Sequence, residues 1–376
     1  MLPKFLMVGL VAGFSLGPLS AALIRGLPEG KSIHPREWPC PIATDIYPCV
    51  CTADEYYNLS IDCSQVISDT QLEKVFEAQF PFKRFLEFRI DHDPEDPNTA
   101  FSSIGAGTFA DISFERVIIR GTELRSVHDE TFANSQGTLK HLDLSKNKLD
   151  DFPFESIALY SLLSTFILDD NVFTFLPPIL SNSLKVVSVS GNNGLYFEEE
   201  VFDSAPTLEE IYMARISLQV LQPRLFTNLQ HLVILDISEN QLEELDEFSI
   251  ASGGKRTLMK VNLDYNNILK IRPQSVLGLS SSANLTMTNN KVAELPEASW
   301  AHIFQQLQPS GMIDLAGNPL TCGCDMAWVM LETNDLYRPL LTDTTKCVTG
   351  EVVIFLELSF FCTQCPGYTC PSSIPK

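Results

Sequence analysis

Three side chains of the types found in a nucleophilic triad stand close together in the chain: His141, Asp143 and Ser145. A serine nucleophile needs an imidazole within hydrogen-bond reach and a carboxylate that orients the imidazole. These residues alternate, however, and alternate residues of a strand point to one face about 6.6 Å apart. Parallel side chains at that spacing do not relay a proton directly, so we expect no catalytic residue here.

Carboxylates are the second group that could do chemistry. Asp143 and Asp236 occupy equivalent positions in two copies of a sequence repeat that are four copies apart. The two carboxylates should then lie about 19 Å apart, which is too far for a paired-carboxylate mechanism. The acidic segment 91–97 has the oxygen density of a calcium loop but lacks its glycine and terminal glutamate, so a solvated loop is preferred to a metal site. The six histidines are scattered and no phosphate-binding glycine loop occurs. The sequence therefore predicts no metal, no cofactor and no enzymatic activity.

The elements that carry these residues follow from a pattern that returns about every 24 residues, a period typical of a leucine-rich repeat. Clear copies run from Leu139 to Leu149 and from Leu232 to Leu242, each as Leu-x-x-Leu-x-(Leu/Ile)-x-x-Asn-x-Leu. The two apolar residues separated by one position lie on a short strand and point inward, while their neighbours point to solvent. We predict an α/β-type solenoid: a leucine-rich repeat horseshoe with a parallel concave β-sheet and an irregular convex side.

Ten copies can be traced, and each has a position at which asparagine is favoured. The copies begin at Phe85, Phe114, Leu139, Leu163, Leu184, Leu208, Leu232, Leu258, Ser282 and Ser310. The asparagine column reads Asp93, Thr122, Asn147, Asn171, Asn192, Ile216, Asn240, Asn266, Asn290 and Asn318. An asparagine amide can satisfy backbone groups of its own turn and of the next repeat. Ile216 cannot, so the turn there should be altered. A column of phenylalanines (Phe109, Phe132, Phe202, Phe226) should fill the convex side of the core.

The ten cysteines lie at the two ends, with none between Cys63 and Cys322. The apolar ends of a solenoid need covering, and disulfide-bonded caps suit an extracellular chain. A zinc site is the alternative for the Cys-x-Cys pairs, but no histidine lies near either group.

Residues 1–22 have an early lysine, an apolar run and small residues, as a secretory signal peptide has. With no further apolar run of membrane length, we expect a secreted, extracellular protein without a membrane anchor.

Charge narrows the range of partners. The formal net charge of -21 argues against nucleic acid and anionic membranes as partners.

The expected domain order is a signal peptide (1–22), an N-terminal extension (23–39), a cysteine-rich N-terminal cap (40–84), about ten repeats (85–320), a cysteine-rich C-terminal cap (321–362) and a tail with an extra cysteine pair (363–376).

Two segments resemble the flanking modules of extracellular leucine-rich repeat proteins. The stretch Asn318-Pro-Leu-Thr-Cys-Gly-Cys-Asp-Met-Ala-Trp328 resembles the C-terminal module, and Cys40 to Cys63 resembles the N-terminal module. Spacing alone leaves the connectivity open. The resemblance implies pairing of first with third and second with fourth cysteine: Cys40 with Cys51, Cys49 with Cys63, Cys322 with Cys347, and Cys324 with Cys362. Cys365 and Cys370 are left over, and their pairing stays open.

A resemblance over most of the chain points to one family. The segments 40–57, 80–90 and 318–328 are similar to secreted crustacean proteins named for the non-catalytic subunit of oplophorus-luciferin 2-monooxygenase. In that enzyme the leucine-rich subunit accompanies a small catalytic subunit and does not oxidise luciferin itself. The resemblance implies an accessory role with a protein partner.

The register exposes an apolar group in the middle of the concave face. Its members are Ile167, Val186, Tyr212 and Ile234, with a rim of Asp143, Asp169, Asp236 and Lys260. An apolar centre with a charged rim is typical of a protein interface. The alternative is that such a face tolerates single aliphatic residues. Two glycosylation sequons begin at Asn58 and Asn284, and a glycan on Asn284 would leave the middle of the face open.

The sequence thus predicts a non-enzymatic protein that binds another protein, and the resemblance implies the accessory subunit of a luciferase-like monooxygenase. Two alternatives from other classes stand beside it. One is a soluble innate-immune protein that recognises microbial glycans or lipids, and the other is a matrix or adhesion component.

Overall fold

The computed structural model describes residues 39–93, 100–254 and 257–369. All of them belong to the larger of two compact units, residues 37–376. The predicted signal peptide (1–22), nearly all of the N-terminal extension (23–39), residues 94–97 of the acidic segment and Cys370 lie outside the described residues.

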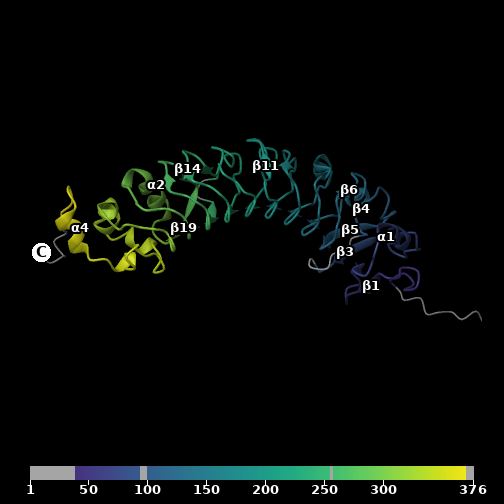
Figure 1. Cartoon of the computed structure of the whole chain (residues 1–376). Helices are drawn as coiled ribbons and strands as arrows, with labels where there is room; N and C mark the ends of the chain where they lie inside the picture. Colours follow the sequence, from purple (N-terminus) through teal and green to yellow (C-terminus); the bar gives the residue numbers. More distant parts are fainter. Residues whose placement is uncertain (1–38, 94–99, 255–256, 370–376) are drawn as a thin grey trace, which may run out of the picture. The chain divides into compact units, whose positions relative to one another are not determined.

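One long sheet runs through this unit (Figure 1). Its strands, in spatial order, are β1 (Val50–Ala53), β2 (Leu59–Asp62), β3 (Arg84–Asp91), β5 (Ser113–Arg120), β7 (His141–Asp143), β8 (Thr165–Ile167), β10 (Val186–Ser188), β12 (Glu210–Tyr212), β13 (Ile234–Asp236), β16 (Leu258–Asn262), β19 (Leu279–Thr286) and β20 (Met312–Asp314). Only β1, among the described strands, pairs antiparallel with its neighbour. Each predicted copy contributes one strand, which confirms the leucine-rich repeat solenoid. β1 and β2 extend the sheet into the N-terminal cap.

Short elements complete the turns between these strands. The remaining strands are β4 (Ser103–Ile104), β6 (Ser126–Val127), β9 (Phe175–Leu176), β11 (Tyr196–Phe197), β14 (Glu244–Leu245), β15 (Ile250–Ala251), β17 (Lys270–Ile271) and β18 (Val276–Leu277). The α-helices are α1 (Asp69–Phe76), α2 (Glu297–Leu307), α3 (Ala327–Met330) and α4 (Leu358–Gln364). The 3-10 helices are η1 (Ala133–Ser135), η2 (Phe154–Leu159), η3 (Cys324–Met326), η4 (Arg338–Leu340) and η5 (Val353–Phe355). Across the described ranges, every helix is too short or too polar to cross a membrane.

The core follows the alternation that the sequence predicts. The residue between the two outward positions of each strand is fully buried, as Leu142, Ile211 and Leu235 show. The predicted phenylalanine column is buried as well. Within it, the rings of Phe109 and Phe132 stack with centroids 5.5 Å apart. This stacking continues the apolar core from one repeat to the next.

The asparagine column is buried and hydrogen-bonded, but it reaches in the opposite direction to the one expected. Asn240 Nδ2 donates to the Ile237 carbonyl of its own turn (3.0 Å) and to the Met213 carbonyl of the preceding repeat (2.8 Å). Its Oδ1 accepts the Leu218 N–H, also of the preceding repeat (3.0 Å). The expected bond to the next repeat was wrong, because the pattern of one repeat does not say which of two equidistant neighbours the amide reaches.

The turn at Ile216 differs from its equivalents only after the column position. A left-handed residue precedes every column position from Thr122 to Asn318, and Arg215 (φ 55°) has the same conformation as Glu239 (φ 54°). Ser217 then adds a second left-handed residue (φ 63°). The Ile216 carbonyl accepts the Gly194 N–H at 3.1 Å. The altered turn that the missing amide predicts is therefore an added left-handed residue.

The last two copies do not use the first residues assigned to them. Ser282 and Ser310 are exposed, whereas Leu279 and Leu307 are fully buried. A register shift between β16 and β19 pairs Leu258 with Leu279. Leu307 comes from the last turn of α2. The assignment of these two anchors was wrong, because a bulge and a helix bring other leucines to the same place.

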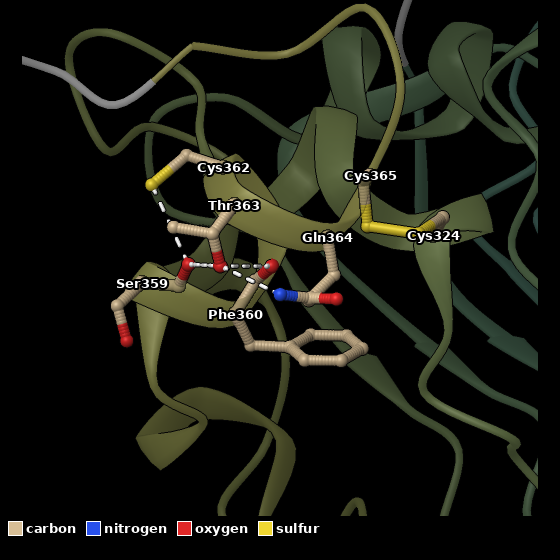
Figure 2. The surroundings of a disulfide bond; sticks show 7 residues. All are labelled: Cys324, Ser359, Phe360, Cys362, Thr363, Gln364 and Cys365. Atoms are coloured by element: carbon tan, nitrogen blue, oxygen red, sulfur yellow. Dashed lines mark hydrogen bonds between the residues drawn. A yellow bond between two sulfur atoms is a disulfide. The ribbon is translucent and has the colours of Figure 1, made fainter.

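Disulfides are found in both caps. Three expected pairs are present: Cys40–Cys51, Cys49–Cys63 and Cys322–Cys347. The fourth expectation was wrong, because Cys324 pairs with Cys365 instead of Cys362 (Figure 2). Both Cys362 and Cys365 belong to the region of α4, and the helix presents Cys365 to Cys324 while Cys362 Sγ lies 3.6 Å from the Ser359 carbonyl oxygen. Cys362 is itself disulfide-bonded, and no cysteine among the described residues is free.

Candidate partner-binding surface

The concave face of the sheet has the register that the sequence predicts. One row joins the first outward residue of each strand: Glu87, Arg116, His141, Thr165, Val186, Glu210, Ile234, Lys260, Asn284 and Met312. A second row joins Arg89, Ile118, Asp143, Ile167, Ser188, Tyr212, Asp236, Asn262, Thr286 and Asp314. The two rows therefore contain every predicted face residue except Asp169, which lies two residues beyond the end of β8.

The apolar centre is present but less open than expected. Ile167, Val186, Tyr212 and Ile234 are half-buried, because neighbouring strands bring other side chains of the face against them. Tyr212 has Ser188 and Asp236 as its direct row neighbours, and Val186 and Ile234 are diagonal to it. The four residues are thus interleaved with polar groups.

Tyr212 is held in place by its own strand. Its hydroxyl donates a hydrogen bond to Glu210 Oε2 at 2.7 Å. Burial, with this bond and the nearby Glu210 charge, raises the pKa of the Tyr212 phenol to about 12. The ring is therefore neutral and fixed on the face.

The predicted rim residues have unequal environments. Asp143 is only 6% exposed, contrary to expectation, because Arg120 lies 3.6 Å from its Oδ2 and the Ser145 N–H donates to its Oδ1. Asp236 is half-buried and accepts hydrogen bonds from Ser238 and Asn262. Lys260 is exposed, and its ammonium has no ion-pair partner within the described part of the chain. Lys260 is therefore the rim charge most available to a partner.

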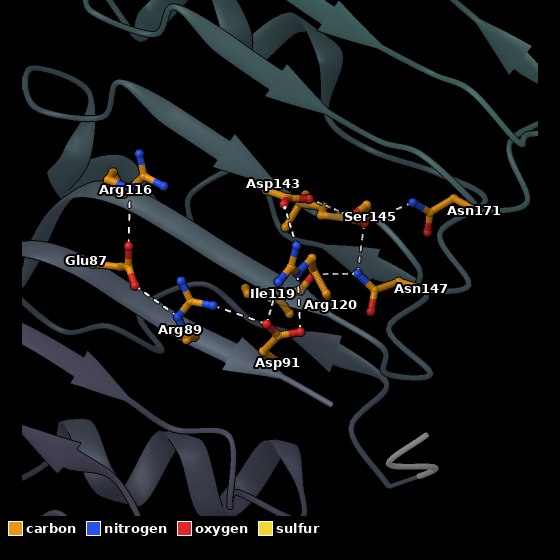
Figure 3. Close-up of polar contacts among 11 residues, drawn as sticks. Glu87, Arg89, Asp91, Arg116, Ile119, Arg120, Asp143, Ser145, Asn147 and Asn171 are labelled. Atoms are coloured by element: carbon orange, nitrogen blue, oxygen red, sulfur yellow. Dashed lines mark hydrogen bonds and ion pairs between the residues drawn. The ribbon is translucent and has the colours of Figure 1, made fainter. Parts of the chain in front are cut away.

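A network of arginines and carboxylates covers the N-terminal part of the face (Figure 3). Glu87 lies between Arg89 (3.0 Å) and Arg116 (3.2 Å). Asp91 lies between Arg89 (3.1 Å) and Arg120. Sequence reasoning missed Asp91 and Arg120, because both follow the positions assigned to the face. The sequence feature that could have indicated this network is the alternation of charge along β3, opposite arginines on β5.

Burial shifts the pKa values of two face residues. Burial, followed by the nearby Arg116 charge, lowers the pKa of His141, so its imidazole is neutral at neutral pH. Burial raises the pKa of the Asp169 carboxyl to about 6, although hydrogen bonds from Ser188 and Ser190 oppose this effect. The face therefore contains one carboxyl that titrates in the mildly acidic range.

The residues of the possible triad have other partners. Asp143 is paired with Arg120, and Ser145 meets it through a backbone N–H instead of a hydroxyl. No hydrogen bond joins His141 to either residue in the described chain. Within the described ranges, no group of three or more His, Cys, Asp or Glu side chains could hold a metal ion. This arrangement fixes side chains on a surface.

The two predicted glycosylation sites differ in position. Asn58 is exposed in the N-terminal cap, where its Nδ2 donates to Asp54 Oδ2 at 2.8 Å. Asn284 is exposed on β19, beside Lys260 and Met312 on the concave face. A glycan on Asn284 would cover the C-terminal end of the face, as the sequence predicts.

Comparisons with known proteins agree with the architecture. The Leucine Rich Repeat family model matches residues 138–159. The non-catalytic subunit of Oplophorus-luciferin 2-monooxygenase from Oplophorus gracilirostris is 28% identical over 87% of this chain and 88% of that protein. Human vasorin is 28% identical over 53% of this chain, which corresponds to 29% of vasorin.

Solved structures show the same fold. A chain of the octameric complex of latrophilin 3, Unc5D and FLRT2, in which FLRT2 contributes leucine-rich repeats, superposes with a TM-score of 0.60 at 15% identity. The match covers 84% of this chain and 99% of that one. A chain of the Drosophila Toll–Spatzle complex gives a TM-score of 0.51 at 20% identity, over 76% and 42% of the two chains. The chain therefore has the leucine-rich repeat fold with disulfide-bonded caps, and it is similar over most of its length to the non-catalytic subunit of Oplophorus-luciferin 2-monooxygenase.

Proposed function

We propose that the protein is a secreted, non-enzymatic accessory subunit that binds a protein partner through the middle of its concave face. The observation that carries the proposal is the apolar centre formed by Ile167, Val186, Tyr212 and Ile234 on one continuous sheet surface. The name of the Oplophorus relative, a non-catalytic subunit, supports an accessory role. A small secreted catalytic subunit is the partner we expect.

Tyr212 is the expected anchor of this interface. A large aromatic ring with a polar tip contributes contact area at low cost in conformational entropy. Its hydrogen bond to Glu210 already fixes the ring, so little order is lost on binding. The arginine–carboxylate network to one side is internally neutralised and should govern orientation more than affinity.

The test begins with purification of the partner from native extracellular fluid, using the intact protein as bait. Tyr212→Ala should then weaken capture of that partner by at least about tenfold while the melting temperature stays close to wild type. Tyr56→Ala is the matched control, because Tyr56 is 76% exposed and lies in the N-terminal cap. Equal affinity of Tyr212→Ala and wild type would exclude the middle of the face. Recovery of a microbial glycan or lipid in place of a protein would contradict the accessory role.

A further inference from the structure

Short strands on the side of the repeats away from the long sheet form a second, interrupted ladder. Phe175 of β9 pairs with Tyr196 of β11, and Glu244 of β14 pairs with Lys270 of β17. Figure 1 shows β11 and β14 on this side. Val220 takes the equivalent place in the copy between Tyr196 and Glu244, at the same spacing from each. The ladder should therefore pass through Val220, and it does not.

The break leaves backbone donors without partners. The N–H groups of Gln219, Val220 and Leu221 donate no hydrogen bond within the described part of the chain. At intact points of the ladder, the Tyr196 N–H donates to the Thr174 carbonyl and the Leu269 N–H to the Glu243 carbonyl, each at 3.0 Å. Unpaired strand-like backbone of this kind is a template for pairing with another chain.

A groove of about 470 Å³ lies at the break. Its lining includes Val220, the carboxylates of Glu243, Glu244 and Asp246, and no lysine or arginine. Arg272 neutralises Glu244. Glu243 and Asp246 have no ion-pair partner among the described residues. The groove therefore has uncompensated negative charge beside unpaired backbone.

An apolar stripe borders the groove. Phe175, Tyr196 and Val220 occupy equivalent positions of three successive copies and are 44%, 57% and 64% exposed. The Phe175 and Tyr196 rings are stacked with centroids 6.0 Å apart. Three neighbouring repeats thus present apolar side chains where the adjacent ones present Asp151 and Glu244.

We propose that this flank binds a basic, extended peptide segment of a partner protein. The backbone of the segment pairs with residues 219–221, its lysine or arginine side chains neutralise Glu243 and Asp246, and its aliphatic side chains cover Val220 and Tyr196. Charge complementarity selects this occupant, because a neutral saccharide would leave both carboxylates uncompensated. The site is separate from the concave face.

The probe is a fluorescein-labelled heptapeptide of alternating valine and lysine, followed by fluorescence anisotropy at physiological ionic strength. Glu243→Gln combined with Asp246→Asn should weaken its binding by at least about tenfold, because charge-assisted hydrogen bonds are lost. Asp150→Asn combined with Asp151→Asn is the matched control: it removes two exposed carboxylates from the same flank, several repeats away, and should change binding by less than about twofold.

Two further probes test the mode of binding. A peptide with proline in place of the central valine should bind more weakly, because proline has no N–H and fixes its backbone. Tyr212→Ala should leave peptide binding unchanged, which separates this site from the proposed concave interface. Absent binding, equal loss in the two double variants, or undiminished binding of the proline peptide would overturn the proposal. So would binding of chitotriose, a neutral oligosaccharide, that depends on Glu243 and Asp246.

Discussion

Asp169 shows how the face of the sheet perturbs a single residue. Its Oδ1 accepts the Ser188 hydroxyl (2.5 Å) and the Ser190 N–H (2.8 Å), both from the next repeat. Burial, with a smaller effect of the nearby Asp170 and Asp143 charges, still raises its pKa to about 6. The carboxylate is therefore less stable in the folded protein than in water at neutral pH.

Replacement of Asp169 by asparagine should make stability less dependent on pH. The folded-state pKa exceeds the unfolded value of 3.8, so the native protein binds the proton more tightly, and wild type loses stability as pH rises from about 4 to about 6. An asparagine side chain at this position cannot ionise, so Asp169→Asn should gain up to about 3 kcal/mol over wild type across that range. Urea unfolding at several pH values measures the difference. The exposed Asp151→Asn is the control, and a difference between Asp169→Asn and wild type that does not grow with pH would contradict the burial argument.

The C-terminal cap is built from short elements that bury aromatic side chains against α2. Trp328 of α3 donates its indole N–H to the Leu295 carbonyl at 2.7 Å. Phe304 of α2, Trp328 and Tyr337 form a cluster with centroids 5.1 to 5.7 Å apart. The Cys324–Cys365 bond connects η3 to the end of α4. The cap thus covers the apolar end of the last repeat.

Loss of either cysteine of that bond should have the same effect. Cys324→Ser, Cys365→Ser and the double variant should each lose about 2–5 kcal/mol of stability, because each removes the same covalent link. Thermal unfolding measures the loss, and peptide mapping without reduction should recover Cys324 linked to Cys365. Recovery of Cys324 linked to Cys362 would show that the cap follows the pairing that the resemblance implies.

At the scale of the whole molecule, each repeat is tied mainly to its neighbours. Asn171 and Asn192 illustrate this, since both donate to the Leu168 carbonyl, at 2.9 and 3.0 Å. Asn290 makes its bonds to Leu263 and Met287, far along the sheet. Stability should then be a sum of local terms and nearest-neighbour terms.

A double-mutant cycle tests this nearest-neighbour coupling. Asn171→Ala and Asn192→Ala should be non-additive by about 0.5–3 kcal/mol, because they share an acceptor. Asn171→Ala and Asn290→Ala should be additive within about 0.5 kcal/mol. Asn267→Ala, an exposed neighbour of the buried Asn266, should have little effect. The free energies come from urea unfolding. Equal coupling in the near and the distant pair would show that the repeats unfold as one unit without local terms.

The sequence by itself determined the solenoid, the ten strands and the face register, from Glu87 to Asp314. Strand alternation turns each side chain either toward the core or toward solvent, so a local pattern suffices. The same reasoning located the asparagine column and the apolar centre around Tyr212. It failed at Ser282 and Ser310, where a bulge and the helix α2 supply the buried leucine.

Only the tertiary structure decided which distant groups meet. Cys324 pairs with Cys365 because α4 orients Cys365 toward Cys324. The spacing of Cys362 and Cys365 in the sequence does not show which of the two has that orientation. Arg120 joins Asp91 to Asp143 across three strands, and the ladder breaks at Val220. These features depend on distances between segments far apart in the chain. A repeat pattern sets the direction of each side chain, but its charged or covalent partner depends on how successive repeats stack.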